Sequence, residues 1–354
     1  ASADSEGFVH LALNLHFSHT AMLLLFLFAT FPLVYFIYWF TKPITTSFSQ
    51  KRATDYSHIF FDETGRRNAF PSLFDPAAVH LSLIAPAYNE EFRLRDMMRE
   101  TLEYLTFRKQ REPTFTFEVI VVDDGSRDRT AEVAQEFTQS YGADNVRVLK
   151  LTENQGKGGA VQQGMLHSRG RYLLMLDSDG ATAIADVERL EADMASSEKD
   201  GHGVICGSRA HLQADAVAKR KWYRNVLMYG FHFAVSMLCV QVKGIRDTQC
   251  GFKLFARKTA QRLFVTQHLR RWSFDVELIV VARKLGLPIK ETAVNWTEVP
   301  GSKLNLVESS ILMLRDLIMI RLCYLLGVWR IAPAPFRQGL GSSAPLSFES
   351  PRRY

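Results

Sequence analysis

The chain has 354 residues, of which 47% are hydrophobic and 23% are charged. This composition excludes a wholly disordered protein, and the length allows one large α/β domain with additional segments. The formal net charge of +6 points to an anionic partner: a nucleic acid, a phosphorylated substrate or a membrane surface. The four cysteines show no CxxC spacing, so neither a disulfide framework nor a zinc site is indicated.

A stretch without charge follows the short N-terminal segment 1–19 and runs over residues 20–40. At about 1.5 Å per residue it would span roughly 30 Å, the thickness of a bilayer core. Its length, with no preceding basic region and no A-x-A site after it, favours a transmembrane anchor over a cleavable signal peptide. Three basic residues follow it before residue 53, so the positive-inside rule puts the remaining chain on the cytoplasmic side.

Residues 41–79 are rich in proline and polar residues and are predicted to be a linker. From residue 80 onward, apolar runs alternate with helical patterns. The predicted strands lie in 80–91, 117–126, 146–151, 171–180 and 203–209, and the predicted helices over 92–108, about 130–141 and after the "GKGG" of 156–159. Continuous apolar strands separated by helices indicate an α/β fold whose mostly parallel sheet is covered on both faces.

This α/β unit is expected to extend over residues 80–305 and to contain a basic and apolar segment, 218–245. Residues 306–331 are apolar but include charged residues such as Arg315 and Asp316, which makes them a poor spanning helix. An amphipathic helix in the membrane interface is the favoured interpretation, and a buried core helix is the alternative; the same question applies to 226–240. Residues 332–354 are expected to form a tail.

Polar residues recur where the predicted strands end. They are Glu90, Asp123, Asp124, Asp177, Asp179 and Arg209. The carboxyl ends of parallel strands meet at one edge of a sheet, where such folds bind ligands. Two carboxylates separated by one residue, with no His or Cys cluster near them in the sequence, suit Mg²⁺ or Mn²⁺ carrying a diphosphate. Asp124 could accept hydrogen bonds from a base or a ribose.

The stretch "NQGKGGA" (154–160) is similar to a phosphate-binding loop, with Lys157 supplying positive charge, although it lacks the Walker pattern. Further basic residues offer a site for a second phosphate. They lie in "AKRKWYR" (218–224), at Lys253, and at Arg270 and Arg271 before Trp272. The alternative for the 218–224 cluster is a solvated surface.

Seven motifs appear in order within residues 80–305: "PAYNEE", "VVDDGSRDRT", "NQGKGGA", "DSDG", "GSR", "DTQCGFKLF" and "RRWSFDVELI". Together they resemble a family 2 inverting glycosyltransferase of the GT-A fold, and more narrowly the polyprenyl-phosphate hexosyltransferases. "VNWTEVPGSKL" (294–304) is similar to the glucosyl branch of that group. The resemblance implies transfer of glucose from UDP-glucose to dolichyl phosphate at the endoplasmic reticulum membrane, in support of N-glycosylation. A GDP-mannose donor or a bacterial undecaprenyl-phosphate acceptor is the alternative.

The resemblance also implies roles for particular residues. Those that would hold the nucleoside of the donor are Pro86, Tyr88, Glu90, Val122 and Asp124. Asp177 and Asp179 would form the DxD pair that binds metal and diphosphate, Ser178 would lie against the nucleotide, and Arg209 would lie near the sugar phosphate. Mannosyl members often follow this pair with Leu-Gln. Here Gly180 and Ala181 stand there, which favours the glucosyl branch.

A lipid monophosphate acceptor is mostly dianionic at neutral pH, so it needs no general base. Its charge must be offset by cations, for which the candidates are Arg220, Arg224, Lys253, Arg270 and Arg271, while Trp272 and Asp275 are candidates for orienting the acceptor or sugar. A nucleic-acid-associated membrane protein and a non-catalytic scaffold are the competing classes. The absence of an RNA-binding motif counts against the first, and the intact acid pair counts against the second.

Overall fold

The computed structural model describes residues 30–42, 44, 59–212, 230, 234–235, 237–239, 242, 244–299 and 306–332. Several predictions therefore lie outside the described residues. These are residues 20–29 of the expected anchor, most of the 218–245 segment with Arg220 and Arg224, and the tail beyond residue 332.

The centre of the fold is a seven-stranded sheet in the order β5-β4-β3-β6-β8-β7-β9. Its strands are β3 (Val79–Ala87), β4 (Phe117–Asp123), β5 (Val146–Lys150), β6 (Gly170–Met175), β7 (Val204–Ser208), β8 (Lys253–Ala256) and β9 (Ile289–Ala293). Strands β3 to β6 pair in parallel, as do β7 and β9, whereas β8 is antiparallel to both of its neighbours. The predicted α/β class and mostly parallel sheet are confirmed. The reversed strand β8 was not predicted.

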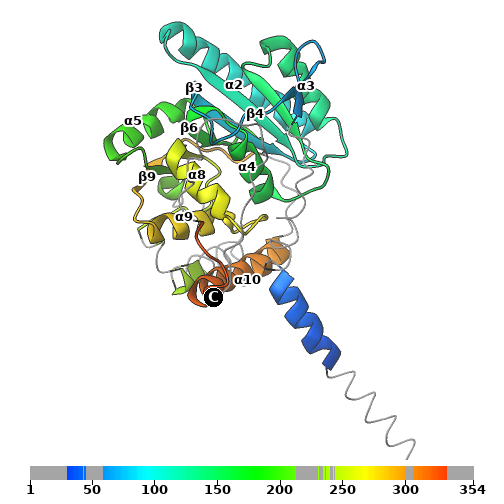
Figure 1. The fold of residues 1–354 in the computed structure, drawn as a ribbon, viewed down its shortest axis with the longest axis vertical. Helices are drawn as coiled ribbons and strands as arrows, with labels where there is room; N and C mark the ends of the chain where they lie inside the picture. Colours follow the sequence, from blue (N-terminus) through cyan, green and yellow to red (C-terminus); the bar gives the residue numbers. More distant parts are fainter. Residues whose placement is uncertain are drawn as a thin grey trace, which may run out of the picture.

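Helices cover both faces of the sheet (Figure 1). One face is covered by α2 (Glu91–Arg111), α3 (Thr130–Tyr141) and α5 (Val187–Ser197), and the other by α4 (Lys157–Leu166), α8 (Arg257–Thr266) and α9 (Phe274–Lys284). Short 3₁₀ turns are η1 (Ile184–Asp186) and η2 (Ala210–Leu212). Leu83 and Ile84 illustrate the cause: successive side chains of a strand point to opposite faces, and these two enter the two separate cores.

Part of the region expected to be a linker belongs to the folded body. Residues 59–69 form an antiparallel hairpin of β1 (Ile59–Phe61) and β2 (Arg67–Ala69). Phe60 and Phe70 pack edge to face at 5.0 Å and, with the fully buried Leu73, join the core on the α4 side. The hairpin therefore extends the body beyond the residue 80 boundary that the sequence suggested.

The last described helix, α10 (Leu306–Leu325), has two different faces. Leu317, Ile320 and Cys323 are buried against the core, whereas Ile311 and Leu325 are 53% and 66% exposed. Its burial thus combines features of both sequence interpretations: one side is core, and the other is an exposed apolar stripe. Such a stripe is typical of a helix that meets an apolar partner.

A helix over residues 30–42 projects from the body beside α10 (Figure 1). The Arg315 guanidinium of α10 lies 5.2 Å from the centre of the Trp39 ring, and Arg315 Nη1 donates to the Trp39 carbonyl at 3.4 Å. Most side chains of this helix are exposed; Phe31 is 73% exposed. Within the described ranges, no helix combines the length and the apolar character needed to cross a bilayer.

A fully buried carboxylate, Glu118, holds together the amino-terminal ends of the parallel strands. Glu118 on β4 accepts hydrogen bonds from Ser82 (2.5 Å), from Arg147 Nη1 (2.8 Å), and from the backbone N–H and Nε of Arg169 (2.6 and 2.8 Å). This one side chain ties β3, β4, β5 and the start of β6 together. Because all its donors lose their acceptor at once, removing the charge is costly.

We expect Glu118→Gln to lower the free energy of unfolding by about 3–5 kcal/mol, because two arginines would be left without a carboxylate in the interior. Chemical denaturation measures the change. The matched control is Glu132→Gln, which removes the exposed partner of Arg129 at 2.8 Å and should change stability little. Equal losses in the two variants would contradict a special role for the buried carboxylate.

Candidate active site

The predicted site residues meet where the order of strands reverses. The chain runs outward from β3 to β4 and β5 and then returns to add β6 on the other side of β3. Ligands of open α/β sheets bind at such a switch point, beyond the carboxyl ends of the strands. Strand β8 runs the opposite way, so it begins at this edge, where Lys253 pairs with Met175 of β6. The loop before β8 is therefore brought onto the residues that follow β6.

Asp177 follows β6 and is enclosed by two other motifs. The Lys157 ammonium, in the first turn of α4, lies 2.5 Å from Asp177 Oδ1. On another side the carboxylate packs directly on Gly251: a Cβ added to Gly251 would lie 2.1 Å from Asp177 Oδ2. Asp177 and Lys157 still keep 33% and 27% of their side chains exposed, so the pair opens to solvent.

Electrostatics keep Asp177 ionised. Burial by itself raises its pKa, but Lys157, together with the charges of Arg209 and Lys253, leaves the pKa of Asp177 below its ordinary value. Asp179, two residues on, accepts a hydrogen bond from the Ala181 backbone N–H at 3.0 Å. Within the described part of the chain Asp179 has no ion-pair partner within 4.0 Å. The pair therefore offers two carboxylates, one compensated and one open.

These carboxylates fit a divalent cation only together with other ligands. Carboxylate oxygens are the donors that Mg²⁺ and Mn²⁺ prefer. No group of three or more His, Cys, Asp or Glu side chains in the described ranges is arranged to hold a metal ion. An ion bound by Asp177 and Asp179 would therefore take its remaining ligands from a diphosphate and water, which is how proteins commonly bind magnesium with nucleotides.

Asp124, at the end of β4, holds the loop that precedes α4. Its two carboxylate oxygens accept the backbone N–H groups of Gln155 (2.7 Å) and Gly156 (2.9 Å). Burial raises the pKa of Asp124 to about 6, although these two hydrogen bonds and the charge of Arg271 oppose the shift. The neighbouring Asp123 is also buried, and its Oδ2 has no hydrogen-bond partner among the described residues. The structure thus gives Asp124 a positioning contact in addition to any ligand contact.

The loop after β3 carries the remaining predicted nucleoside residues. Pro86 lies in β3 and Val122, fully buried, in β4, whereas Tyr88 is 41% exposed. The Glu90 carboxylate is engaged by Arg93 in a two-pronged ion pair whose Nε contact measures 2.6 Å. That hydrogen bond, with a contribution from the charge of Asp179, raises the pKa of Arg93. Arg93 thus brings positive charge near the open carboxylate.

The loops after β3 and β4 are joined by hydrogen bonds. Asn89 has a positive φ of 55° and donates its backbone N–H to Ser126 Oγ at 2.9 Å. Its side-chain Oδ1 accepts the Arg127 backbone N–H at 2.9 Å. The Glu90 backbone N–H donates to Thr130 Oγ1 at 2.8 Å. "PAYNEE" and "VVDDGSRDRT" therefore form one wall. Ser178, which was expected against the nucleotide, is buried between the two acids of the pair.

Arg209, which follows β7, is fixed by Asp247, a residue to which the sequence pattern assigns no role. Asp247 accepts Arg209 Nε at 2.7 Å, Nη2 at 2.9 Å and the backbone N–H at 3.0 Å. The guanidinium also lies 5.4 Å from the ring centre of Trp296, which pairs with Thr182 beside the DxD loop. Burial lowers the pKa of Arg209, but Asp247 more than offsets this and raises it, so the charge is permanent.

Lys253 does not lie where its predicted role in phosphate binding requires. It is 1% exposed, and its ammonium donates to the Cys250 carbonyl at 2.8 Å and contacts Asp275 Oδ1 at 2.5 Å. Asp275, predicted to orient acceptor or sugar, is correspondingly buried at 4% exposure. This pair lies beneath Asp177 and contributes to its charge balance. Reaching a lipid phosphate would require breaking a buried ion pair, so the expectation for Lys253 is corrected.

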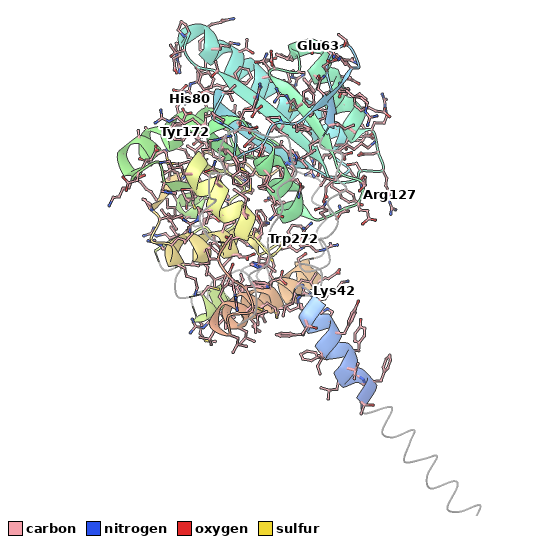
Figure 2. The ribbon with its side chains drawn as sticks, in the orientation of Figure 1. Lys42, Glu63, His80, Arg127, Tyr172 and Trp272 are labelled. Carbon is pink, nitrogen blue, oxygen red and sulfur yellow. The ribbon has the colours of Figure 1, made fainter. Side chains whose placement is uncertain are left out.

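The other predicted phosphate ligands, Arg270 and Arg271, lie beside the 154–160 loop. The backbone N–H of Gly159 donates to the Arg270 carbonyl at 2.8 Å, and Arg270 Nη1 donates to Gln155 Oε1 at 2.5 Å. Arg271 is exposed, and Trp272 is partly buried on the side of the body nearer α10 (Figure 2). The glycines of this loop therefore serve close packing against residues 270–274, where Phe274 leaves Gly158 no room for a Cβ.

Asp177 of "DSDG" thus contacts "NQGKGGA" and "DTQCGFKLF" directly. The motifs "GSR" and "RRWSFDVELI" are joined to "DTQCGFKLF" by ion pairs, and the two motifs of the other wall are joined to "NQGKGGA" at Asp124. The sequence pattern by itself assigns no role to Gly251 and Asp247, which the structure places against Asp177 and Arg209. The available signal is the motif "DTQCGFKLF", which contains both positions.

Comparison with known proteins agrees with this geometry. The profile of the family described as "Glycosyl transferase family 2" matches residues 82–264. The chain belongs to this family. A "Dolichyl-phosphate beta-glucosyltransferase" of Dictyostelium discoideum is 49% identical over 77% of this chain and 85% of the relative, and a human protein of that name is 51% identical over 77% and 84%. The yeast protein of the same name is 38% identical over 78% and 86%.

Among solved structures, a glucosyl-3-phosphoglycerate synthase from Mycobacterium tuberculosis in complex with uridine diphosphate is similar at 17% identity. The match covers 69% of this chain and 79% of that one, with a TM-score of 0.49. Family membership makes this chain a glycosyltransferase of GT-A-like architecture.

For this glycosyltransferase we expect Gly251→Ala to lower the rate of sugar transfer by about 100-fold, because the new methyl group would displace the Asp177 carboxylate. The fold should remain, as judged by circular dichroism and thermal melting. Gly286→Ala is the control, since a Cβ there meets nothing within 4 Å; its φ of +66°, which Gly251 does not share, means that the control tests backbone strain without a steric clash. Full activity in Gly251→Ala would show that the close approach has no functional role.

Proposed function

We propose that this glycosyltransferase moves glucose from UDP-glucose to dolichyl phosphate with inversion, giving dolichyl β-glucosyl phosphate and UDP. The observation that carries the proposal is the identity of about one half, over 77% of the chain, to relatives named for that reaction. A phosphate oxygen of the acceptor forms the new bond to C1 of glucose, and the bond from C1 to the diphosphate breaks on the opposite face. The product would supply glucose for N-glycosylation.

The donor would be held at the switch point. Tyr88, Glu90 and Asp124 line the nucleoside side, and Asp177 and Asp179 face the diphosphate. A divalent cation, Mg²⁺ or Mn²⁺, offsets the negative charge that develops on a departing diphosphate. In this chain, Lys157 is already oriented toward Asp177, so its ammonium adjoins the same phosphates. Asp247 fixes Arg209 so that its guanidinium meets the sugar phosphate without reorganising.

The acceptor would enter from the side of Arg270 and Arg271. A phosphate monoester is mostly dianionic at neutral pH, so it attacks without losing a proton to the enzyme. Consistent with this, the buried Asp275 is paired with the Lys253 ammonium at 2.5 Å, so it is not free to act as a base. The chain's task is to bring two anions together, and for that it needs arginines and lysines at the site.

A lipid acceptor suits the apolar surface beside the site. The exposed apolar side chains of α10 and those of residues 31–38 belong to two helices that meet where Arg315 contacts Trp39. We propose that both contact the endoplasmic reticulum membrane, with the catalytic unit on its cytoplasmic side. Protease treatment of sealed microsomes tests this orientation: the unit should be digested, and protection until detergent is added would refute it.

The metal proposal is tested with Asp179→Asn. We expect transfer to fall by at least about 100-fold, since an amide is a weak ligand for a hard cation and a poor partner for its charge. Manganese binding in the presence of UDP, measured by calorimetry, should weaken in parallel. Asp96→Asn, which removes an exposed carboxylate paired with Arg99 on α2, is the control. Normal turnover in Asp179→Asn would refute a metal-assisted departure of UDP.

The substrate pair is tested with the purified full-length protein in phospholipid vesicles. Radiolabelled UDP-glucose, UDP-galactose and GDP-mannose are each offered with dolichyl phosphate and with undecaprenyl phosphate. We expect labelled lipid from UDP-glucose with dolichyl phosphate, sensitive to chelator. Labelling from GDP-mannose alone would overturn the donor, and strict dependence on undecaprenyl phosphate would overturn the acceptor.

A further inference from the structure

Glu277 is a fully buried carboxylate to which the mechanism above assigns no role. It lies in the first turn of α9 and accepts the backbone N–H groups of His268 (3.0 Å) and Leu269 (2.7 Å) and the Tyr324 hydroxyl (2.9 Å). The His268 ring nitrogen Nδ1 lies 2.9 Å from Glu277 Oε1. A buried charge with this many donors is stable, and it joins α9, the segment after α8, and α10 at one point.

That segment continues directly into the active site. Residues 268–272, here called the acceptor segment, contain the two arginines proposed to meet the lipid phosphate. The carbonyls of Arg270 and Arg271 accept the backbone N–H groups of Gly159 (2.8 Å) and Gly158 (3.3 Å), which satisfies the first turn of α4. A Cβ on Gly156 would lie only 2.8 Å from the Arg270 carbonyl. Because the two backbones touch, a shift of the acceptor segment moves the start of α4 and the lysine that contacts Asp177.

At its other end the acceptor segment is clamped by α10 and the residues after it. The His268 ring stacks on Trp329 with centres 4.7 Å apart and planes 7° apart, and Tyr324 meets Trp329 edge-on at 5.6 Å. The Ala332 backbone N–H donates to Thr266 Oγ1 at 3.1 Å. The helix that carries Tyr324 is the same one whose opposite face is the exposed apolar stripe. One face of α10 is thus proposed to meet the membrane, and the other packs against the acceptor segment.

We propose that Glu277, together with His268 and Tyr324, is a positioning residue for the acceptor: it holds the acceptor segment so that its arginines meet the phosphate of a polyprenyl phosphate monoester. This inference rests on the proposed function, since it presupposes a lipid phosphate acceptor. Seating of α10 then determines how well the acceptor is used, while donor binding, which depends mainly on the loops after β3, β4 and β6, changes much less.

A purely structural role predicts something else. Loosening a buried network lowers stability and disturbs both substrates together. A positioning role separates them, because only one wall of the site is attached to Glu277. The measurements must therefore compare acceptor KM with donor affinity, and must include one readout that does not depend on transfer at all.

The test is Tyr324→Phe in the full-length protein in phospholipid vesicles, which removes one hydroxyl and keeps the ring stack. We expect the KM for dolichyl phosphate to rise about tenfold, since a hydrogen bond to a charged group is lost. Affinity for UDP with manganese, measured by calorimetry, should stay within about twofold. The matched control is Tyr104→Phe, which removes another tyrosine-to-glutamate hydrogen bond, to Glu188 at 2.5 Å on the α2 side. It should leave both parameters unchanged.

Amide hydrogen exchange provides the readout that is independent of transfer. In Tyr324→Phe, exchange should rise at residues 268–272 and at 156–159, but not in Tyr104→Phe. An unchanged acceptor KM, a matching loss of UDP affinity, or faster exchange confined to α10 would each overturn the proposal. If the wild-type protein does not use dolichyl phosphate, the proposed function fails, and spread of exchange to 156–159 still decides whether Glu277 positions that wall.

Discussion

The site depends on the way one carboxylate is enclosed. Asp177 has the Lys157 ammonium on one side and the bare backbone of Gly251 on another, so its position is fixed by a charge and by a steric limit at once. Two acids at the end of a buried strand would otherwise repel each other and lose solvation. The surrounding cations make this arrangement stable. The proposed reaction brings together an anionic donor and an anionic acceptor, and it requires cations of this kind.

The charges of the site are arranged as pairs, each with a separate task. Lys157 balances Asp177 at the opening, whereas Lys253 balances Asp275 underneath it, and Asp247 fixes Arg209 at the side. Pairing keeps each cation ionised and oriented before any substrate arrives. Preorganised charge of this kind is the main means by which an enzyme stabilises charge that develops during reaction. Asp179 has no such ion-pair partner among the described residues, which leaves this carboxylate available to a metal.

The architecture explains why a lipid and a sugar nucleotide could meet here. One wall consists of the loops after β3 and β4, which are hydrogen-bonded to each other and face the nucleoside. The other wall is the acceptor segment, which depends on α9 and α10. Because α10 is also the helix with an exposed apolar face, the surface proposed to face lipid and the wall proposed to bind the phosphate are parts of one packed unit. A soluble acceptor would not need that connection.

The fold class, the ligand-binding edge and the family could be predicted from the sequence. Apolar strands followed by acidic residues, such as those before Asp124 and Asp177, indicate a parallel sheet with a ligand-binding edge. Such apolar runs and the polar residues that end them are local properties of the chain, so they can be read from the sequence. The order of the motifs was enough to indicate the family. Tertiary structure alone decided the contacts that depend on strand direction. The antiparallel course of β8 buries Lys253 and puts Gly251 on Asp177, and no local pattern carries that information, since the pairing joins residues 78 to 84 positions apart in the chain.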